Sequence, residues 1–177
     1  MDGVGCSIVL SNLFNDFLGI NEVDVLHVSY GDVQQTILNF INLSDEDTMV
    51  IISDLYIETG FLKTILEFEH VKKLLYIDHH ERSDSRRGLE SLKFMHGGVF
   101  QYRWKKGFSA VASAYEFAVK NGFPETDKFD RLVNIIDVYD EWKTDRPEFT
   151  EGLSLNSIYW DYGFDKFFEV FYNGLFW

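Results

Sequence analysis

Two continuous apolar runs on either side of an amphipathic segment constrain the fold of this chain more than any other feature. The runs are TMVIISDLYI (48–57) and LLYID (74–78), and segment 58–73 between them has apolar residues at helical spacing. An apolar run without polar alternation predicts a strand covered on both faces, as in a parallel sheet. The pattern therefore predicts an α/β fold with a doubly wound, mainly parallel sheet and helices on both faces.

The flanking segments continue this alternation. On the N-terminal side, 4–18 and 33–43 have helical spacing, and the β-rich segment 23–31 is predicted as the first strand of this chain. On the C-terminal side we predict a strand in 97–104 and three helices, in 109–122, 127–142 and the aromatic segment 158–177. Ser109 and Gly122 suit the two ends of the first of these helices.

Charge and composition limit the partners. The formal net charge is −13, whereas proteins that grip long duplex nucleic acid carry a basic stripe, so a short oligonucleotide or a nucleotide fits better. No run approaches the roughly 20 apolar residues that span a bilayer, so no membrane partner is expected. Cys6 is the single cysteine, which excludes a disulfide within the chain and suits a reducing compartment; we expect a cytoplasmic protein.

Acidic side chains follow two of the predicted strands at the point where each ends. Asp54 follows MVIIS, and Asp78 follows LLYI and is itself followed by His79 and His80. Ligands of parallel sheets bind beyond the carboxyl ends of the strands, so these side chains are expected at one edge. Carboxylate and imidazole ligands without thiolates suit Mn²⁺, Mg²⁺ or Fe²⁺.

Each of these features has a simpler explanation when it is taken alone. A strand-ending Asp is usually a turn residue or a helix cap, and a His pair is more often structural than metal-binding. The acids of helix 127–142, Asp137 and Asp140, would ordinarily face water. The joint order of the features is much harder to obtain by chance, and it favours a metal site.

Four motifs in this order resemble the DHH phosphoesterase superfamily, which includes RecJ-type exonucleases, nanoRNases, cyclic-dinucleotide phosphodiesterases and family II pyrophosphatases. DGVGC resembles the end of the first motif, SDLYI the second, YIDHHERS the name-giving third and IIDVYDEW the fourth. FSAVASAYEFA resembles the helix after the active-site strands. The resemblance spans nearly the whole chain.

The resemblance implies metal-dependent hydrolysis of phosphoester or phosphoanhydride bonds, usually with two Mn²⁺ ions. Asp54 would bridge the metals, Asp78 would orient a histidine, and His80 would meet the phosphate or the leaving group. The metal ligands would be Asp2, Asp54, His79 and Asp137, with Asp140 in reserve for Asp137.

The chain departs from the family pattern at both ends. It begins at the last Asp of the first motif, without the upstream His and Asp that ligate the second metal, so we expect one tightly bound Mn²⁺ (or Mg²⁺) and weak or no hydrolysis of a linear dinucleotide. Residues 1–150 would form the DHH catalytic domain. Residues 151–177 would be a C-terminal helical segment, or the start of a linker to an absent substrate-binding domain, and could make a homo-oligomer contact through their aromatic side chains.

The favoured function is therefore hydrolysis of phosphodiester bonds in short oligonucleotides or in nucleotides, cyclic ones included. The alternative is a truncated or degenerate domain that binds metal or nucleotide without turnover, and a pyrophosphatase-like activity is less favoured. Arg82, Arg86 and Arg87 are predicted to hold a substrate phosphate, because the planar guanidinium matches phosphate geometry. A solvated basic loop is the competing interpretation of these arginines.

Overall fold

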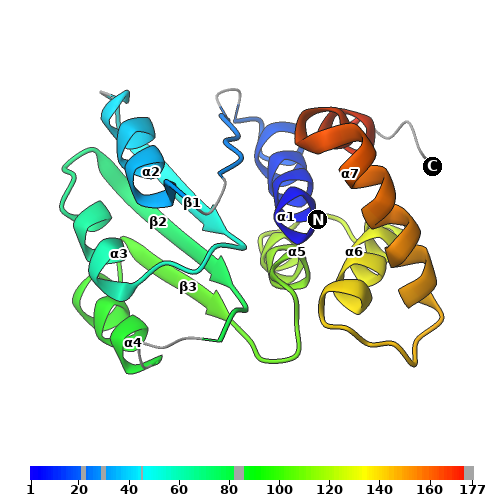
Figure 1. Cartoon of the computed structure of the whole chain (residues 1–177). Coiled ribbons are helices and arrows are strands. Elements are labelled where there is room, and N and C mark those ends of the chain that lie inside the picture. Colours follow the sequence, from blue (N-terminus) through cyan, green and yellow to red (C-terminus); the bar gives the residue numbers. More distant parts are fainter. Residues whose placement is uncertain (21–22, 29–30, 45, 82–85, 174–177) are drawn as a thin grey trace. The chain divides into compact units, whose positions relative to one another are not determined.

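The computed structural model describes the chain except residues 21–22, 29–30, 45, 82–85 and 174–177. The chain divides into two compact units (Figure 1). Residues 28–104 form the first, called the sheet unit here. Residues 1–27 and 105–177 together form the second, called the helical unit.

The sheet unit is built around a three-stranded parallel sheet with strand order β1–β2–β3. Helix α3 connects β1 to β2, and helix α4 connects β2 to β3. When successive parallel strands are added on the same side of a sheet, right-handed connections place their helices on the same face. The predicted α/β fold with a parallel sheet is confirmed. Its elements are α2 (Val33–Asn42), β1 (Thr48–Ser53), α3 (Thr59–Leu66), β2 (Val71–Asp78), α4 (Arg86–Met95) and β3 (Phe100–Trp104).

The three helices of the sheet unit share one hydrophobic core with the sheet. Val50, Leu74 and Phe100 lie side by side on one face of the sheet, and this face packs with apolar side chains of α2, α3 and α4. Leu75 and Ile77 alternate with Leu74 along β2 and point to the opposite face, and both are buried. This explains why the apolar run before Asp78 does not alternate.

In the helical unit, all regular secondary structure among the described residues is helical. Gly5 allows close packing there, because a Cβ at this position would lie 2.8 Å from Ile136 Cδ1 and 3.0 Å from Val111 Cγ2. Gly163 has φ 74° and interrupts the last helix with a kink. The elements are α1 (Asp2–Ser11), a π-helix (Asn12–Phe17), α5 (Ala110–Lys120), α6 (Asp127–Asp140) and α7 (Glu148–Tyr172).

No helix in the described part of the chain is both long enough and apolar enough to cross a bilayer. The long helix α7 carries acidic residues such as Asp161, Asp165 and Glu169 among its aromatic side chains.

Two expectations from the sequence need correction. Residues 23–28 of the predicted strand 23–31 have no regular secondary structure, and residues 29–30 lie outside the described residues. Val25 and Leu26 are 38% and 45% exposed, and β-branched side chains favour a strand only where a partly buried surface receives them. The segment after His80, for which no helix was predicted, contains α4, whose buried Leu89 and Leu92 are spaced for one helical face.

Candidate metal centre

Asp54 follows the last residue of β1 and has an unusual backbone conformation. Its φ of 54° lies in the left-handed region, which aspartate tolerates better than most residues. Its N–H donates to the Ile77 carbonyl at 3.0 Å, so the residue stays attached to β2 while its chain turns away from the sheet. Backbone strain of this kind is concentrated at functional sites.

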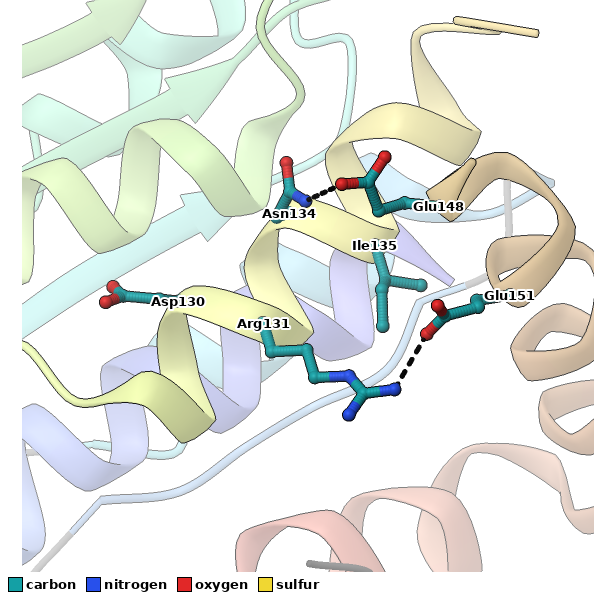
Figure 2. Close-up of a pocket in the computed structure, with 6 residues that line it drawn as sticks. All are labelled: Asp130, Arg131, Asn134, Ile135, Glu148 and Glu151. Carbon is teal, nitrogen blue, oxygen red and sulfur yellow. Dashed lines mark hydrogen bonds and ion pairs between the residues drawn. The ribbon is translucent and has the colours of Figure 1, made fainter. Parts of the chain in front are cut away.

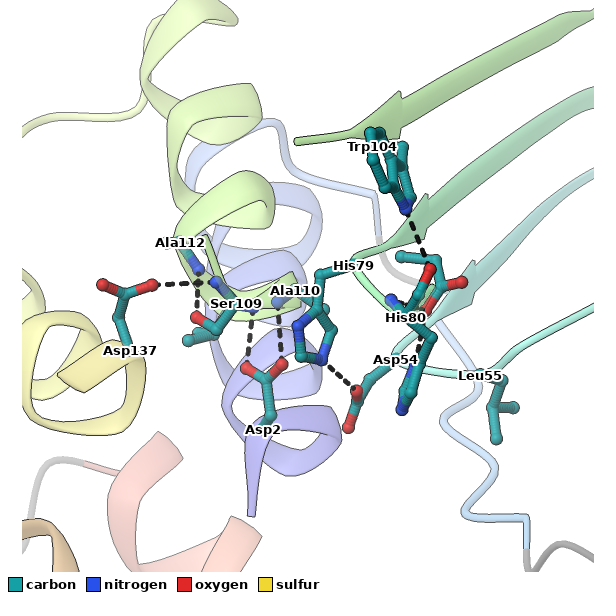
Figure 3. A network of polar contacts seen from close by, with 12 residues as sticks. Asp2, Asp54, Leu55, His79, His80, Trp104, Ser109, Ala110, Ala112 and Asp137 are labelled. Carbon is teal, nitrogen blue, oxygen red and sulfur yellow. Dashed lines mark hydrogen bonds and ion pairs between the residues drawn. The ribbon is translucent and has the colours of Figure 1, made fainter. Parts of the chain in front are cut away.

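Asp54, His79 and His80 offer three ligand atoms at the carboxyl ends of two adjacent strands (Figure 3). These atoms lie within 4.8 Å of one another, and His79 Nε2 is 3.5 Å from Asp54 Oδ1. Two ligands at about 2.0–2.2 Å from one ion, separated by about 90–110°, lie about 2.8–3.6 Å apart. The donor set and its spacing therefore fit a divalent metal ion.

Asp78 is fully buried, and its carboxylate holds the side chain of His80. Its Oδ1 is 2.7 Å from His80 Nδ1, and its Oδ2 accepts a hydrogen bond from the Tyr76 hydroxyl at 2.7 Å. Burial would raise the pKa of Asp78, but the hydrogen bonds from His80 and Tyr76 outweigh it and hold this pKa below its usual value. Asp78 is therefore an ionised acceptor.

An ionised Asp78 determines the orientation of the His80 ring. Because the carboxylate can only accept, His80 Nδ1 must carry a proton, and Nε2 is the nitrogen left for a metal or a substrate. The hydrogen bond with Asp78 raises the pKa of His80, against the opposing effect of burial. The Trp104 indole N–H donates to the His80 carbonyl at 3.0 Å, so β3 also holds this turn (Figure 3).

The Tyr76 hydroxyl connects the two strand ends of the site. Besides its contact with Asp78, it lies 3.0 Å from the Leu55 carbonyl and accepts from the Ile57 N–H at 3.2 Å. The hydroxyl has one proton, which it donates to Asp78, the nearer of the two acceptors. The hydroxyl thereby ties the segment after Asp54 to the residue before His79.

We expect Tyr76→Phe to lower the free energy of unfolding by about 1–3 kcal/mol, because the Ile57 N–H and the Asp78 carboxylate lose a buried partner. Urea unfolding of the metal-free protein measures this change. Tyr102→Phe is the matched control, since its hydroxyl bonds Glu90 at an exposed position and its loss should cost less than about 0.5 kcal/mol. Equal losses in both variants would contradict the connecting role of Tyr76.

Two further predicted ligands, Asp2 and Asp137, lie in the helical unit at the N-terminus of α5 (Figure 3). Asp2 accepts from the Ala110 and Val111 N–H groups at 2.7 and 2.8 Å. Asp137 Oδ1 accepts from the Ser109 N–H at 2.8 Å, and its Oδ2 is 2.6 Å from Lys143 Nζ. Both carboxylates thus compensate the unpaired N–H groups and the positive dipole end of this helix.

The structure therefore groups the predicted site residues within units. Asp54, Asp78, His79 and His80 meet in the sheet unit. In the helical unit, Asp2 and the reserve ligand Asp140 offer carboxylate oxygens within 4.8 Å of each other, whereas Asp137 bonds Ser109 and Lys143. The convergence of all these residues on one metal centre stays a prediction.

The three arginines give a mixed result. Arg86 and Arg87 are exposed in the first turn of α4, whereas Arg82 lies outside the described residues. Arg86 and Arg87 are thus the first two residues of α4. That the arginines hold a phosphate stays a prediction.

A hollow between α6 and α7 contains none of the predicted residues (Figure 2). Its polar side chains pair within the unit: Asn134 donates to Glu148 at 3.2 Å, Arg131 pairs with Glu151 at 3.0 Å, and Asp130 accepts from Tyr115 at 2.7 Å. We assign no function to this hollow.

The chain is distantly similar to a known nuclease. It is 24% identical to oligoribonuclease NrnB of Bacillus subtilis (strain 168) over 174 residues, which cover 94% of this chain and 41% of that protein. The chain thus spans less than half the length of this relative. No family model matches the chain, and no solved structure matches it. This similarity agrees with the resemblance to the DHH superfamily and supports no more specific assignment.

The sequence motifs did not reveal the residues that support the candidate ligands. Trp104 ends a strand and Lys143 follows a helix, so neither stands in a motif. Tyr76 begins the stretch YIDHHERS, but the resemblance assigns it no role. The alternation along β2 offered one signal, because residues two apart in a strand face the same side and Tyr76 is two residues before Asp78.

Proposed function

We propose that this chain is the metal-binding part of a phosphoesterase that hydrolyses phosphodiester bonds in short oligonucleotides. The observation that carries the proposal is the group of three ligand atoms from Asp54, His79 and His80 at the carboxyl edge of a parallel sheet. The similarity to an oligoribonuclease supports short RNA as the substrate class.

The side chains have separate roles in this proposal. Asp54 Oδ1 and His79 Nε2 would hold the ion, which we propose is Mn²⁺, with Mg²⁺ as the substitute. The bound ion would polarise the phosphate and activate the attacking water. Asp78 holds His80 so that its Nε2 is left for the ion, the phosphate or the leaving group. Asp2 and Asp137, or Asp140 in place of Asp137, would add carboxylates to the same centre.

Metal removal tests this function. We expect the purified chain to bind one Mn²⁺ tightly and to cleave the linear dinucleotide pApA slowly, because Asp54, His79 and His80 offer one group of three ligand atoms. EDTA should abolish cleavage, and added Mn²⁺ should restore it. Metal analysis and chromatography of the products measure both quantities.

The same experiment separates the alternatives. Tight Mn²⁺ binding with no cleavage of pApA would favour the domain that binds without turnover. Cleavage of inorganic pyrophosphate in preference to pApA would favour the pyrophosphatase-like activity. Cleavage that persists in EDTA, or no Mn²⁺ binding at all, would overturn the proposal.

A further inference from the structure

A row of aromatic rings runs along β3 towards the candidate metal centre. Phe100, Tyr102 and Trp104 alternate along the strand and so face the same side of the sheet. Phe100 is fully buried, and Tyr102 stacks on it with ring centroids 6.1 Å apart. Trp104 ends the row, in register with Asp78 on β2. The row therefore extends from the core to the edge where the metal ligands lie.

Cations of α4 lie over the two outer rings of this row. Lys93 Nζ is 5.8 Å from the centre of the Tyr102 ring, and Arg86 Cζ is 5.8 Å from that of Trp104. The side chain of Arg86 is 64% exposed, and its Nε is 4.0 Å from Glu90, the outer limit of an ion pair. Part of the guanidinium is therefore open to a ligand.

Trp104 is itself fixed to the metal-binding turn. Its indole N–H donates to the His80 carbonyl, so Arg86, Trp104 and His80 form a continuous chain of contacts. The N–H groups of a guanidinium lie in its own plane. A guanidinium over an aromatic ring therefore keeps them available for bidentate hydrogen bonds to an anion. The contacts thus connect Arg86 through the Trp104 ring to the backbone of His80, one of the candidate ligands.

We propose that Arg86, supported by Trp104, binds a phosphate group of the nucleotide substrate next to the metal centre, with Trp104 as a positioning residue. This inference rests on the proposed function and adds a specific subsite to it. It also separates Arg86 from its neighbour Arg87, which is equally cationic and exposed but has no such aromatic support among the described residues.

Binding of adenosine 5′-monophosphate to the Mn²⁺-loaded protein tests the subsite without turnover. Isothermal titration calorimetry should give a dissociation constant that rises about tenfold or more in Arg86→Ala, because a charge-assisted hydrogen bond to phosphate is lost. Arg87→Ala removes the same charge from the next residue and should change the constant less than about twofold. Equal effects of the two substitutions would overturn the subsite.

A double-mutant cycle tests the role of Trp104. Trp104→Ala should weaken binding about two- to fivefold in the wild-type background, through the lost cation–π contact, and have almost no effect in the Arg86→Ala background. Trp104→Phe keeps a ring under the guanidinium and should retain most of the affinity even though it loses the indole N–H. Additive effects of Trp104→Ala and Arg86→Ala would overturn the positioning role, and thermal unfolding of each variant checks that it is folded.

Cleavage of pApA distinguishes failure of this inference from failure of the proposed function. If the wild type cleaves pApA, Arg86→Ala should raise KM about tenfold with a smaller change in kcat. An unchanged KM would overturn the subsite while the function stands. If the wild type binds Mn²⁺ but cleaves nothing, the result favours the domain that binds without turnover, and the binding measurement alone decides the subsite.

Discussion

Asp54→Asn should raise the dissociation constant for Mn²⁺ by more than about a hundredfold, because loss of a direct ligand exceeds the ~10–100-fold effect of losing a supporting contact. Asp54 Oδ1 lies 3.5 Å from His79 Nε2, so the two atoms are spaced to share one ion. The amide has nearly the same shape as the carboxylate but lacks its charge. Equilibrium dialysis with metal analysis measures the binding, and cleavage of pApA should fall in parallel.

Asp47→Asn provides a matched control in the same unit. Asp47 makes an ion pair with Lys72 at 3.4 Å, and its side chain is 75% exposed. The substitution removes the same charge without touching the ligand group, so Mn²⁺ binding should stay within about twofold of the wild type. Wild-type Mn²⁺ affinity in Asp54→Asn would remove Asp54 from the site.

The sequence predicted the sheet well because its signal is local. The buried strands before Asp54 and Asp78 are continuous apolar runs, and the helix between them has clear periodicity, so the parallel pairing of β1 and β2 followed. The segment 23–31 has the same β-rich composition, but composition does not reveal whether a neighbouring surface will receive a strand.

The candidate site was predictable to the extent that it depends on strand ends. Asp54 and His79 follow adjacent parallel strands, and this alone brings them to the same edge. The supporting contacts depend on long-range packing that no short motif records. Trp104 reaches His80 across 24 residues of sequence, and Asp2 reaches Ala110 across 108.

Asp2 illustrates this long-range dependence, because its carboxylate has a structural role apart from any metal. It is 1% exposed, and its two oxygens accept from the first N–H groups of α5. Asp137 accepts from the Ser109 N–H and the Ser109 hydroxyl from the Ala112 N–H, so four oxygens of three side chains serve the four N–H groups from Ser109 to Ala112. A buried helix end without such partners is unfavourable.

We therefore expect Asp2→Ala to lower the free energy of unfolding of the metal-free protein by about 2–6 kcal/mol, since two buried N–H donors lose their acceptor at about 1–3 kcal/mol each. Asp2→Asn should have an intermediate effect, because its amide oxygen replaces one acceptor and its NH₂ group opposes the other donor. Urea unfolding measures both, and Asp145→Ala, at an exposed position of the same unit, should stay within about 0.5 kcal/mol of the wild type. If Asp2→Ala unfolds at the wild-type midpoint without metal, the carboxylate does not stabilise α5, and its burial must instead be explained by ligation alone.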